Sequence, residues 1–258
     1  MIYFISDLHL SPQAPRVTQR LFDFLDFLGQ RAQSKAAKEG GASLLPHLYI
    51  LGDLFEVWLG DDCLDDPADD FSREIVAALQ RLTQRGVKLS FLHGNRDFLL
   101  GEAFAQRCSA KLLKDPYTLS LPSWQFVLSH GDALCTDDAP YQNFRREVRS
   151  PLWQASFLAK PLPERRAIAQ GLRRQSENAK QEKSATSYLM DLNPGATDDF
   201  IRQHGYATFI HGHTHRPATH DHWVDGIHVE RWVMADWQDE RGEYLVWDGQ
   251  TLRREILS

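Results

Sequence analysis

A short apolar run that ends in polar, metal-capable side chains occurs five times along this chain, and this repetition most constrains the fold. The runs cover residues 2–5, 48–51, 89–92, 126–128 and 208–210, and Asp, Asn or His follows each of them within a few residues. Runs of this length, rich in aromatic, leucine and β-branched residues and closed by polar residues or glycine, predict strands buried on both faces. Five such segments predict five buried strands of a β-sheet protein, with polar residues at the strand ends.

The segments between the first three runs predict amphipathic helices. The first carries its apolar residues on one helical stripe, formed by Val17, Leu21, Phe24, Leu25 and Leu28. The second repeats this pattern with Phe71, Ile75, Leu79 and Leu82. Alternating strands and helices predict an α/β fold whose ligands gather beyond the strand ends. The Gln30–Ser43 stretch, rich in Ala, Gly, Lys and Gln, is predicted to be a loop after the first helix.

Two later regions differ from this alternation. Residues 139–190 favour helix and contain no strand-like run, which predicts a helical cap inserted into a single domain of residues 1–258. After residue 215 the pattern becomes alternating, with turn signals at Asp225-Gly226 and Asp248-Gly249 that predict antiparallel hairpins.

Charge is unevenly distributed along the chain. The formal net charge is −6, yet residues 145–183 hold ten basic and four acidic residues, a local charge of +6. The acidic balance argues against a nucleic-acid binder. The basic stretch is suited to an anionic phosphate and to an anionic membrane surface. Aspartates crowd residues 61–70 without the spacing of an EF-hand, and we expect a solvated acidic surface there.

The chain has the composition of a soluble intracellular protein. No apolar stretch approaches the roughly 20 residues of a membrane span. The first residues lack the basic start and the small-residue cleavage site of a signal peptide. Cys63, Cys108 and Cys135 are odd in number and widely spaced, which is typical of a reducing compartment. We therefore expect a cytoplasmic location.

The polar clusters together hold a set of metal-binding side chains. Singly, each histidine at a strand end is more often structural than a ligand. As a set they supply seven candidates, which are Asp7, His9, Asp53, Asn95, His130, His213 and His215. Imidazole nitrogens mixed with carboxylate and amide oxygens suit manganese, iron or zinc. Seven ligands for two ions imply that one carboxylate bridges.

In their order along the chain, these motifs resemble those of the calcineurin-like metallophosphoesterases. The motifs are Asp7-x-His9, Gly52-Asp53, Gly94-Asn95, His130 and Gly212-His213-x-His215. The resemblance implies a sandwich of mixed sheets flanked by helices, and two metal ions. It places one ion on Asp7, His9, Asp53 and His215, and the other on Asp53, Asn95, His130 and His213. Two ions about 3.5–4 Å apart activate a shared water and clamp phosphoryl oxygens.

Arg96 departs from the pattern of that family. Most members have a histidine after the motif asparagine, where it can protonate an alkoxide leaving group. Arginine cannot act as a general acid near neutral pH, but it can neutralise phosphate charge. The substitution suits a leaving group that needs no proton, such as a phosphate leaving from a diphosphate. The alternative is that Arg96 only pairs with Asp97.

Longer motifs resemble one branch, the hydrolases that cleave UDP-2,3-diacylglucosamine in lipid A biosynthesis. They cover residues 51–56, 93–101, 130–138 and 211–217. This resemblance implies water attack on the α-phosphorus, giving UMP and 2,3-diacylglucosamine 1-phosphate, with two Mn²⁺ ions per chain. Asp53 and Arg96 would be catalytic.

The same branch implies a substrate site and a location. Its substrate-binding positions correspond to Asn95, Arg96, Asp138, Tyr141, Arg173, Ser176, Lys180, Lys183 and His213, with Lys180 replacing the asparagine of that branch. The partners implied are a lipid-linked sugar nucleotide and the cytoplasmic face of the inner membrane, which the protein would bind peripherally. We expect no nucleic-acid partner and no obligate protein partner.

The apolar residues of the basic insertion have two interpretations. They line a groove for acyl chains, or they pack the insertion onto the domain; the residues are Leu152, Trp153, Phe157, Leu158, Leu162, Ile168 and Leu172. Two alternative functions stay open. One is a metallophosphoesterase for a soluble dinucleotide polyphosphate or another phosphodiester, and the other is a binding scaffold with a vestigial metal site. An apolar insertion disfavours the first, and the full set of seven ligands disfavours the second.

Overall fold

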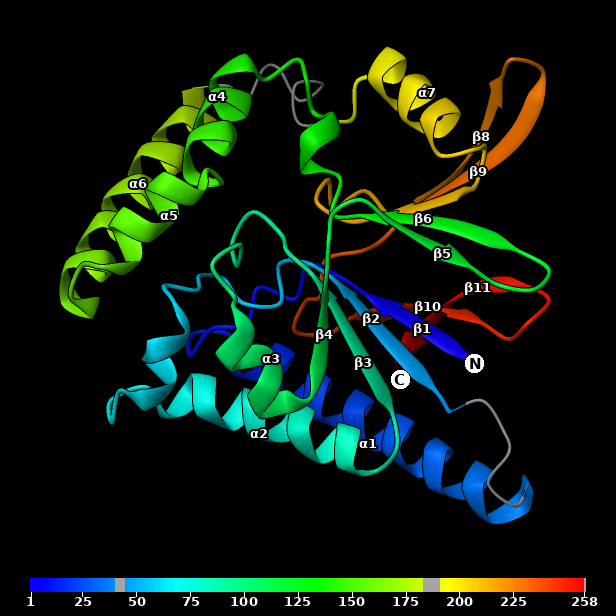
Figure 1. Cartoon of the computed structure of the whole chain (residues 1–258), viewed down its shortest axis with the longest axis horizontal. Helices are drawn as coiled ribbons and strands as arrows, with labels where there is room; N and C mark the ends of the chain where they lie inside the picture. The colour runs from blue at the N-terminus through cyan, green and yellow to red at the C-terminus, as the bar shows by residue number, and fades with distance from the viewer. Residues whose placement is uncertain (40–44, 183–190, 258) are drawn as a thin grey trace.

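Two mixed β-sheets packed face to face form the centre of the protein (Figure 1). This computed structural model describes residues 1–39, 45–182 and 191–257, without the side chains of 35–39 and 175–182. The first sheet has the order β11-β10-β1-β2-β3-β4 and the second the order β5-β6-β7-β9-β8. The first sheet consists of β1 (Ile2–Ile5), β2 (His47–Leu51), β3 (Lys88–Leu92), β4 (Ala110–Leu113), β10 (Gly242–Trp247) and β11 (Leu252–Leu257). The second consists of β5 (Tyr117–Ser120), β6 (Gln125–Ser129), β7 (Thr208–His211), β8 (Ala218–Val224) and β9 (Ile227–Val233).

The five strands predicted from the apolar runs are confirmed as β1, β2, β3, β6 and β7. Strands β1 to β4 pair in parallel, with Ile2 opposite His47 and His47 opposite Lys88. Strands β6 and β7 are also parallel. Parallel strands bring their carboxyl ends to one edge of a sheet, so the polar segments that follow these strands gather there.

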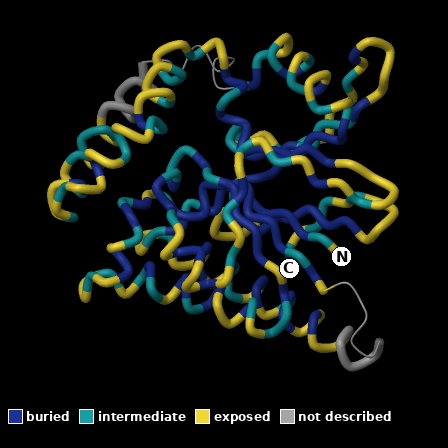
Figure 2. Tube along the Cα trace, in the orientation of Figure 1, coloured by how far each residue is buried: buried dark blue, intermediate teal, exposed yellow. Residues whose placement is uncertain are grey.

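Alternation along each strand divides the core into layers. Tyr3 and Ile5 belong to the cluster that the helices cover, whereas Phe4 belongs to the cluster between the two sheets. Phe126 and Leu128 of β6 also face the space between the sheets. The central strands are buried on both faces, as the dark strands in Figure 2 show, because one face meets helices and the other meets the opposite sheet.

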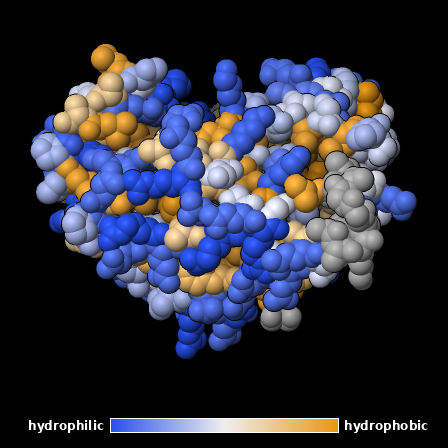
Figure 3. Space-filling model, turned by 60° about the horizontal axis from the view of Figure 1, so that its bottom comes forward, coloured by the Kyte–Doolittle hydropathy of each residue, from blue (hydrophilic) through white to orange (hydrophobic). Residues whose placement is uncertain are grey.

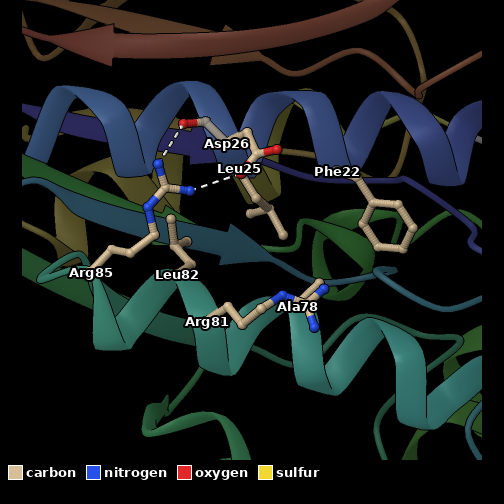
Figure 4. Close-up of a pocket in the computed structure, with 7 residues that line it drawn as sticks. All are labelled: Phe22, Leu25, Asp26, Ala78, Arg81, Leu82 and Arg85. Atoms are coloured by element: carbon tan, nitrogen blue, oxygen red, sulfur yellow. Dashed lines mark hydrogen bonds and ion pairs between the residues drawn. The ribbon is translucent and has the colours of Figure 1, made fainter. Parts of the chain in front are cut away.

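Helices α1 (Pro15–Glu39), α2 (Asp70–Gln84) and α3 (Glu102–Cys108) cover the outer face of the first sheet. Both predicted apolar stripes face the core. In Figure 4, Arg85 at the end of α2 reaches Asp26 of α1, with 2.8 Å between Nη1 and Oδ1. Seen from below Figure 1, this side of the molecule is largely hydrophilic, with scattered hydrophobic groups (Figure 3).

The predicted loop at Gln30–Ser43 is wrong for most of its length. Helix α1 continues to Glu39, and residues 40–43 lie outside the described residues. Alanine, glutamine and lysine are strong helix formers, so they extend the helix after its buried stripe ends. Composition alone did not distinguish a polar helix end from a loop.

On the other side, α7 (Pro194–Gln203) packs on the outer face of the second sheet through Phe200 and Phe209. The two predicted hairpins are confirmed as β8–β9 and β10–β11. Asp225 and Gly226 both have positive φ, of 53° and 79°, as the tight turn between β8 and β9 requires.

Between β6 and α7 the chain forms α4 (Ala139–Val148), α5 (Pro151–Leu158) and α6 (Leu162–Glu182). These helices stand beside the sheets rather than on them (Figure 1). We refer to residues 139–182 as the cap. The boundary predicted at residue 190 lies outside the described residues. Among the described helices, none is both long and apolar enough to span a bilayer.

Candidate metal centre and substrate cleft

All seven side chains proposed as metal ligands lie at one edge of the two sheets. They follow β1, β2 and β3 of the first sheet and β6 and β7 of the second. In chain order they are Asp7, His9, Asp53, Asn95, His130, His213 and His215. The cluster therefore forms across the junction of the two sheets, where no single element supplies it.

The backbone at this edge is unusual. Five of the seven residues have positive φ, with values from 49° to 69°: Asp7, His9, Asp53, His213 and His215. Non-glycine residues rarely adopt this region, and such strain concentrates at functional sites. Gly94 permits the close approach of two loops, because a Cβ atom there would collide with the Asp53 backbone and carboxylate.

One half of the cluster surrounds Asp7. Its Oδ1 lies 3.4 Å from His215 Nε2 and 4.0 Å from His9 Nε2. The two histidines face each other, with 3.1 Å between their Nε2 atoms. Asp53 Oδ2 lies 3.8 Å from His9 Nε2. Donor atoms of Asp7, His9 and His215 are close enough to share one ion.

The other half surrounds Asn95. Its Oδ1 lies 2.9 Å from both His130 Nε2 and His213 Nδ1. Asp53 Oδ2 lies 3.6 Å from His130 Nε2 as well. Asp53 therefore stands between the two halves, which is the position that a bridging carboxylate requires.

Buried hydrogen bonds hold these groups in place. The backbone N–H groups of Gly94, Asp53 and Leu54 donate to the Asp97 carboxylate at 2.9, 3.2 and 2.7 Å. Asp97 thus ties the loop after β2 to the loop after β3. His130 Nδ1 lies 2.9 Å from the Leu51 carbonyl oxygen, which turns Nε2 towards the cluster. Such outer contacts orient metal-binding histidines.

Carboxylates and histidines at this density shift each other's pKa values. Burial lowers the pKa of His130, but Asp53 and Asp7 outweigh it and raise the pKa to about 9. Burial and the neighbouring His130 lower the pKa of His213 to about 4. Burial raises the pKa of Asp7, but His215, His130 and His9 reverse this and hold it well below its usual range. The buried carboxylates therefore attract positive charge to the cluster.

The donor set fits a pair of divalent transition-metal ions. It combines four imidazoles with two carboxylates and one amide oxygen, and no thiolate is among the seven. Manganese, iron and zinc accept such mixed nitrogen and oxygen ligands. Donor atoms of Asp7, Asp53 and His130 are also close enough to share one ion, so Asp7 belongs to both groups of neighbouring donors.

Glu56 is a site residue that sequence reasoning missed. Its Oε2 lies 3.0 Å from His9 Nδ1. Its Oε1 lies 3.2 Å from Arg173 Nη2 of α6 and 3.9 Å from Arg96 Nη1. Burial raises the pKa of Glu56, but these three partners outweigh it and lower the pKa. The available signal was a lone acid in an apolar stretch, three residues after Asp53.

Arg96 does not pair with Asp97, which was its alternative role. Its side chain points to Glu56, while its backbone N–H donates to Asp53 Oδ1 at 2.8 Å. Asp97 accepts backbone N–H groups instead. The Arg96 side chain is therefore placed beside the cluster.

Asp132, also missed from the sequence, anchors the cap. It is fully buried and accepts hydrogen bonds from Arg145 Nε at 2.7 Å and from the Tyr141 hydroxyl at 2.8 Å. Burial raises the pKa of Asp132, but Arg149, His130 and Arg145 hold it well below its usual range. Two residues predicted to bind the substrate also make contacts within the protein. The Tyr141 hydroxyl donates to Asp132, and Asp138 caps α4 by accepting a hydrogen bond from the Tyr141 N–H.

A cleft of about 920 Å³ runs from the cluster to the inner side of the cap. His9, Asp53, Asn95, His213 and His215 line one end. The wall beyond them is largely apolar and is formed by Phe71, Phe98, Leu99, Phe144, Val148, Trp153, Phe157, Leu162 and Leu172. Of the residues predicted for an acyl groove, Trp153, Phe157, Leu162 and Leu172 line this cleft. Leu152 and Leu158 are exposed, and Ile168 packs against the core.

The predicted solvated acidic surface at residues 61–70 is correct only in part: Asp65 and Asp70 are 72% and 94% exposed, but other aspartates of the run make specific contacts. Asp61 accepts N–H groups from Gly101 and Phe104, at 3.0 and 2.9 Å. Asp62 and Asp66 pair with Arg165 and Arg166 of α6. The acidic run and part of the basic stretch therefore neutralise each other across the contact between loop and cap.

Three predicted substrate positions fall where the structure gives no side chain. Ser176 and Lys180 lie in α6, but their side chains are outside the described residues, as is Lys183 entirely. Arg173, the preceding predicted contact, lines the cleft.

Comparison with known proteins agrees with this geometry. Residues 1–217 match the family model for the calcineurin-like phosphoesterases. A UDP-2,3-diacylglucosamine hydrolase of Aromatoleum aromaticum is 50% identical over 95% of this chain and 92% of its own length. Hydrolases of the same name from Aeromonas hydrophila and Chromohalobacter salexigens are 46% and 42% identical, covering 94% and 92% of this chain and 92% and 89% of their own. The chain therefore belongs to the calcineurin-like phosphoesterase family, in the branch that contains these UDP-2,3-diacylglucosamine hydrolases.

Proposed function

We propose that the protein hydrolyses the diphosphate of UDP-2,3-diacylglucosamine with two bound Mn²⁺ ions. Water attacks the α-phosphorus, and the products are UMP and 2,3-diacylglucosamine 1-phosphate. The hydrolases it resembles over nearly their whole length carry the name of this substrate.

One observation supports this function most strongly: the metal-binding cluster and the apolar cap wall share a single cleft. Its volume of about 920 Å³ lies at the upper end for small-molecule sites. A diacylated sugar nucleotide has a diphosphate for the polar end and two hydrocarbon chains for the apolar end. A soluble dinucleotide polyphosphate has no hydrocarbon chains that could contact the apolar wall.

The seven clustered side chains would hold the ions, which activate a water and stabilise charge on the phosphoryl oxygens. Asp53 would hold both ions at a fixed separation because it lies between the two halves. The His130 ring keeps its orientation through the Leu51 carbonyl oxygen. These contacts are present before substrate binds, so little reorganisation is required during the reaction.

Arg96 would stabilise the charge of the diphosphate at the edge of the cluster. A guanidinium is a poor general acid and cannot supply a proton to the leaving group. A sugar phosphate is a stable anion and leaves without protonation. An arginine at this position therefore matches a diphosphate substrate better than an alkyl phosphodiester.

We also assign the protein to the cytoplasmic face of the inner membrane, as a peripheral protein. The exposed Leu152 and Leu158 of α5 lie on the cap, as do the exposed Arg146 and Arg174. Apolar and basic side chains together favour an anionic bilayer surface. Replacing both arginines with glutamate should weaken sedimentation with anionic vesicles, and added salt should reduce the difference.

The proposed substrate is tested by comparing kcat/KM for two diphosphates at saturating Mn²⁺. We expect efficient cleavage of UDP-2,3-diacylglucosamine, its loss with EDTA, and at least about 100-fold slower cleavage of a dinucleotide polyphosphate, since several methylenes at ~0.8 kcal/mol each contribute to binding. A preference for the soluble substrate would instead support the alternative phosphoesterase function.

A further inference from the structure

The carboxylate of Glu56 connects three parts of the protein. It contacts His9 from the loop after β1, Arg96 from the loop after β3, and Arg173 from α6 of the cap. The two carboxylate oxygens have different partners: Oε2 contacts His9, and Oε1 faces Arg96 and Arg173. One side chain thus links the candidate metal centre to the cap.

Glu56 also occupies the place where a phosphate of the substrate would be recognised. Glu56, Arg96 and Arg173 all line the cleft beside the cluster. Guanidinium groups bind carboxylates and phosphates with the same donor geometry. The single carboxylate oxygen Oε1 that faces both cleft arginines therefore occupies a position suited to one phosphate oxygen.

We propose that Glu56 is a positioning residue. Its carboxylate pairs with Arg96 and Arg173, and the diphosphate of the substrate replaces it as the partner of both guanidinium groups. This inference rests on the proposed function, because the diphosphate is the anion that would displace the Glu56 carboxylate.

The contacts of Glu56 are suited to such an exchange. The Arg173 side chain is 52% exposed and Glu56 is 16% exposed, with 3.2 Å between Nη2 and Oε1. Solvent on the Arg173 side weakens such a pair. A phosphate group bears more negative charge than a carboxylate and offers more acceptor oxygens, so it can displace Glu56 from the guanidinium groups. His9 keeps the Glu56 side chain beside the site during the exchange.

Small-anion binding separates this role from a purely structural one. We would titrate inorganic phosphate into the Mn²⁺-loaded protein by calorimetry at constant ionic strength. Glu56→Gln should lower the dissociation constant for phosphate about 5- to 10-fold, because the carboxylate charge no longer competes with phosphate for the two guanidinium groups. Arg173→Gln alone should change it less than 2-fold, because Glu56 already engages that guanidinium. The double variant should lose most of the gain seen in Glu56→Gln.

Asp236 provides a matched control. Its Oδ2 lies 3.8 Å from His215 Nδ1, so it is placed beside His215 much as Glu56 is placed beside His9. The ion pairs found among the described residues join Asp236 only to that histidine. Asp236→Asn should therefore tighten phosphate binding less than 2-fold, although it removes the same charge. Glu56→Asp, which keeps the charge, should bind phosphate like the wild type.

Two results would overturn the role of Glu56. One is a tightening in Glu56→Gln no larger than that in Asp236→Asn, which would indicate a general effect of charge. The other is a 10-fold weakening in Arg173→Gln alone, which would show that Arg173 is not occupied in the wild type. The second result is decisive even if Glu56→Gln binds metal poorly. Because no lipid is used, the outcome is separate from any failure to hydrolyse UDP-2,3-diacylglucosamine.

Discussion

At the scale of single residues, Asp53 is the group on which both halves of the cluster depend. Its Oδ2 lies 3.8 Å from His9 Nε2 and 3.6 Å from His130 Nε2. Asp53→Ala and His130→Ala should each lower kcat by roughly three orders of magnitude or more, because the activated water and the phosphoryl clamp are lost together. Steady-state kinetics at saturating Mn²⁺, with circular dichroism as the test of folding, measure this.

The matched control is His228→Ala, which removes an exposed histidine of β9 that is not among the seven clustered residues. This variant should retain wild-type turnover. Folded Asp53→Ala protein with near-wild-type kcat would contradict a dinuclear mechanism.

Arg96 allows a second test of the chemistry. Arg96→Ala should cost about 100-fold in kcat/KM on the diphosphate substrate, since charge-assisted contacts to phosphate are strong. On an aryl phosphodiester the loss should stay below about 10-fold, because less charge is stabilised there. Comparison of the two substrates, with Arg96→Lys as the charge-preserving control, makes the measurement. Equal losses on both substrates would show that Arg96 only maintains the site.

The seven clustered side chains could be named from the sequence because each follows a strand end and carries a metal-capable group. Glu56 and Asp132 lie inside the motifs at residues 51–56 and 130–138, but their contacts could not be predicted, because their partners come from distant parts of the chain. Arg173 lies more than 100 residues after Glu56, and Arg145 belongs to the cap. Strand periodicity contains no information about such contacts.

At the scale of elements, the contact between α6 and the loop before α2 holds the cap beside the sheets. Arg165 is almost fully buried and pairs with Asp62, while its Nε donates to the Lys160 carbonyl oxygen at 3.0 Å. Asp62→Asn should destabilise the protein by roughly 1–3 kcal/mol, because a buried guanidinium loses its counter-charge. Urea denaturation measures the change.

Asp70→Asn is the control for this substitution, since the Asp70–Arg73 pair lies at the surface and Asp70 is 94% exposed. We expect a change of at most about 0.5 kcal/mol there. Equal stability of Asp62→Asn and the wild type would mean that Arg165 does not need Asp62.

The cap wall permits a test of acyl binding. Leu172 lines the cleft, whereas Ile256 of β11 is 64% exposed and outside the lining. Leu172→Asp should raise KM for the diacyl substrate about 10-fold or more, since each methylene buried against the wall contributes ~0.8 kcal/mol. A chain-free phosphodiester should be cleaved as before. Ile256→Asp should leave both KM values unchanged; an equal rise in both variants would contradict acyl binding at this wall.

Elements with strong periodicity were predictable, and those defined by pairing across the chain were not. The central strands β1, β2 and β3 and the stripes of α1 and α2 follow from apolar spacing. The pairing of Asp62 and Asp66 with α6 could not be predicted, because Arg165 and Arg166 lie about 100 residues later in the chain. Phe157, a predicted groove residue, is buried against Trp153 at a ring distance of 4.7 Å and serves both core and cleft.

At the scale of the whole molecule, the two sheets and the cap contribute different residues to one cleft. The sheets bring the seven proposed ligands to a common edge, and the cap forms an apolar wall of the same cleft. Asp132, Glu56 and Asp62 connect the cap to the sheets and to the loop before α2. The proposed metal site and the apolar wall therefore share one continuous cleft.

Hydrolysis of UDP-2,3-diacylglucosamine in ¹⁸O-labelled water tests this division most directly. Mass spectrometry of the products should find UMP carrying one heavy oxygen and unlabelled 2,3-diacylglucosamine 1-phosphate, because water attacks the α-phosphorus at the metal centre while the cap holds the acyl chains. The label in the sugar phosphate, or products other than these two, would contradict the proposed reaction.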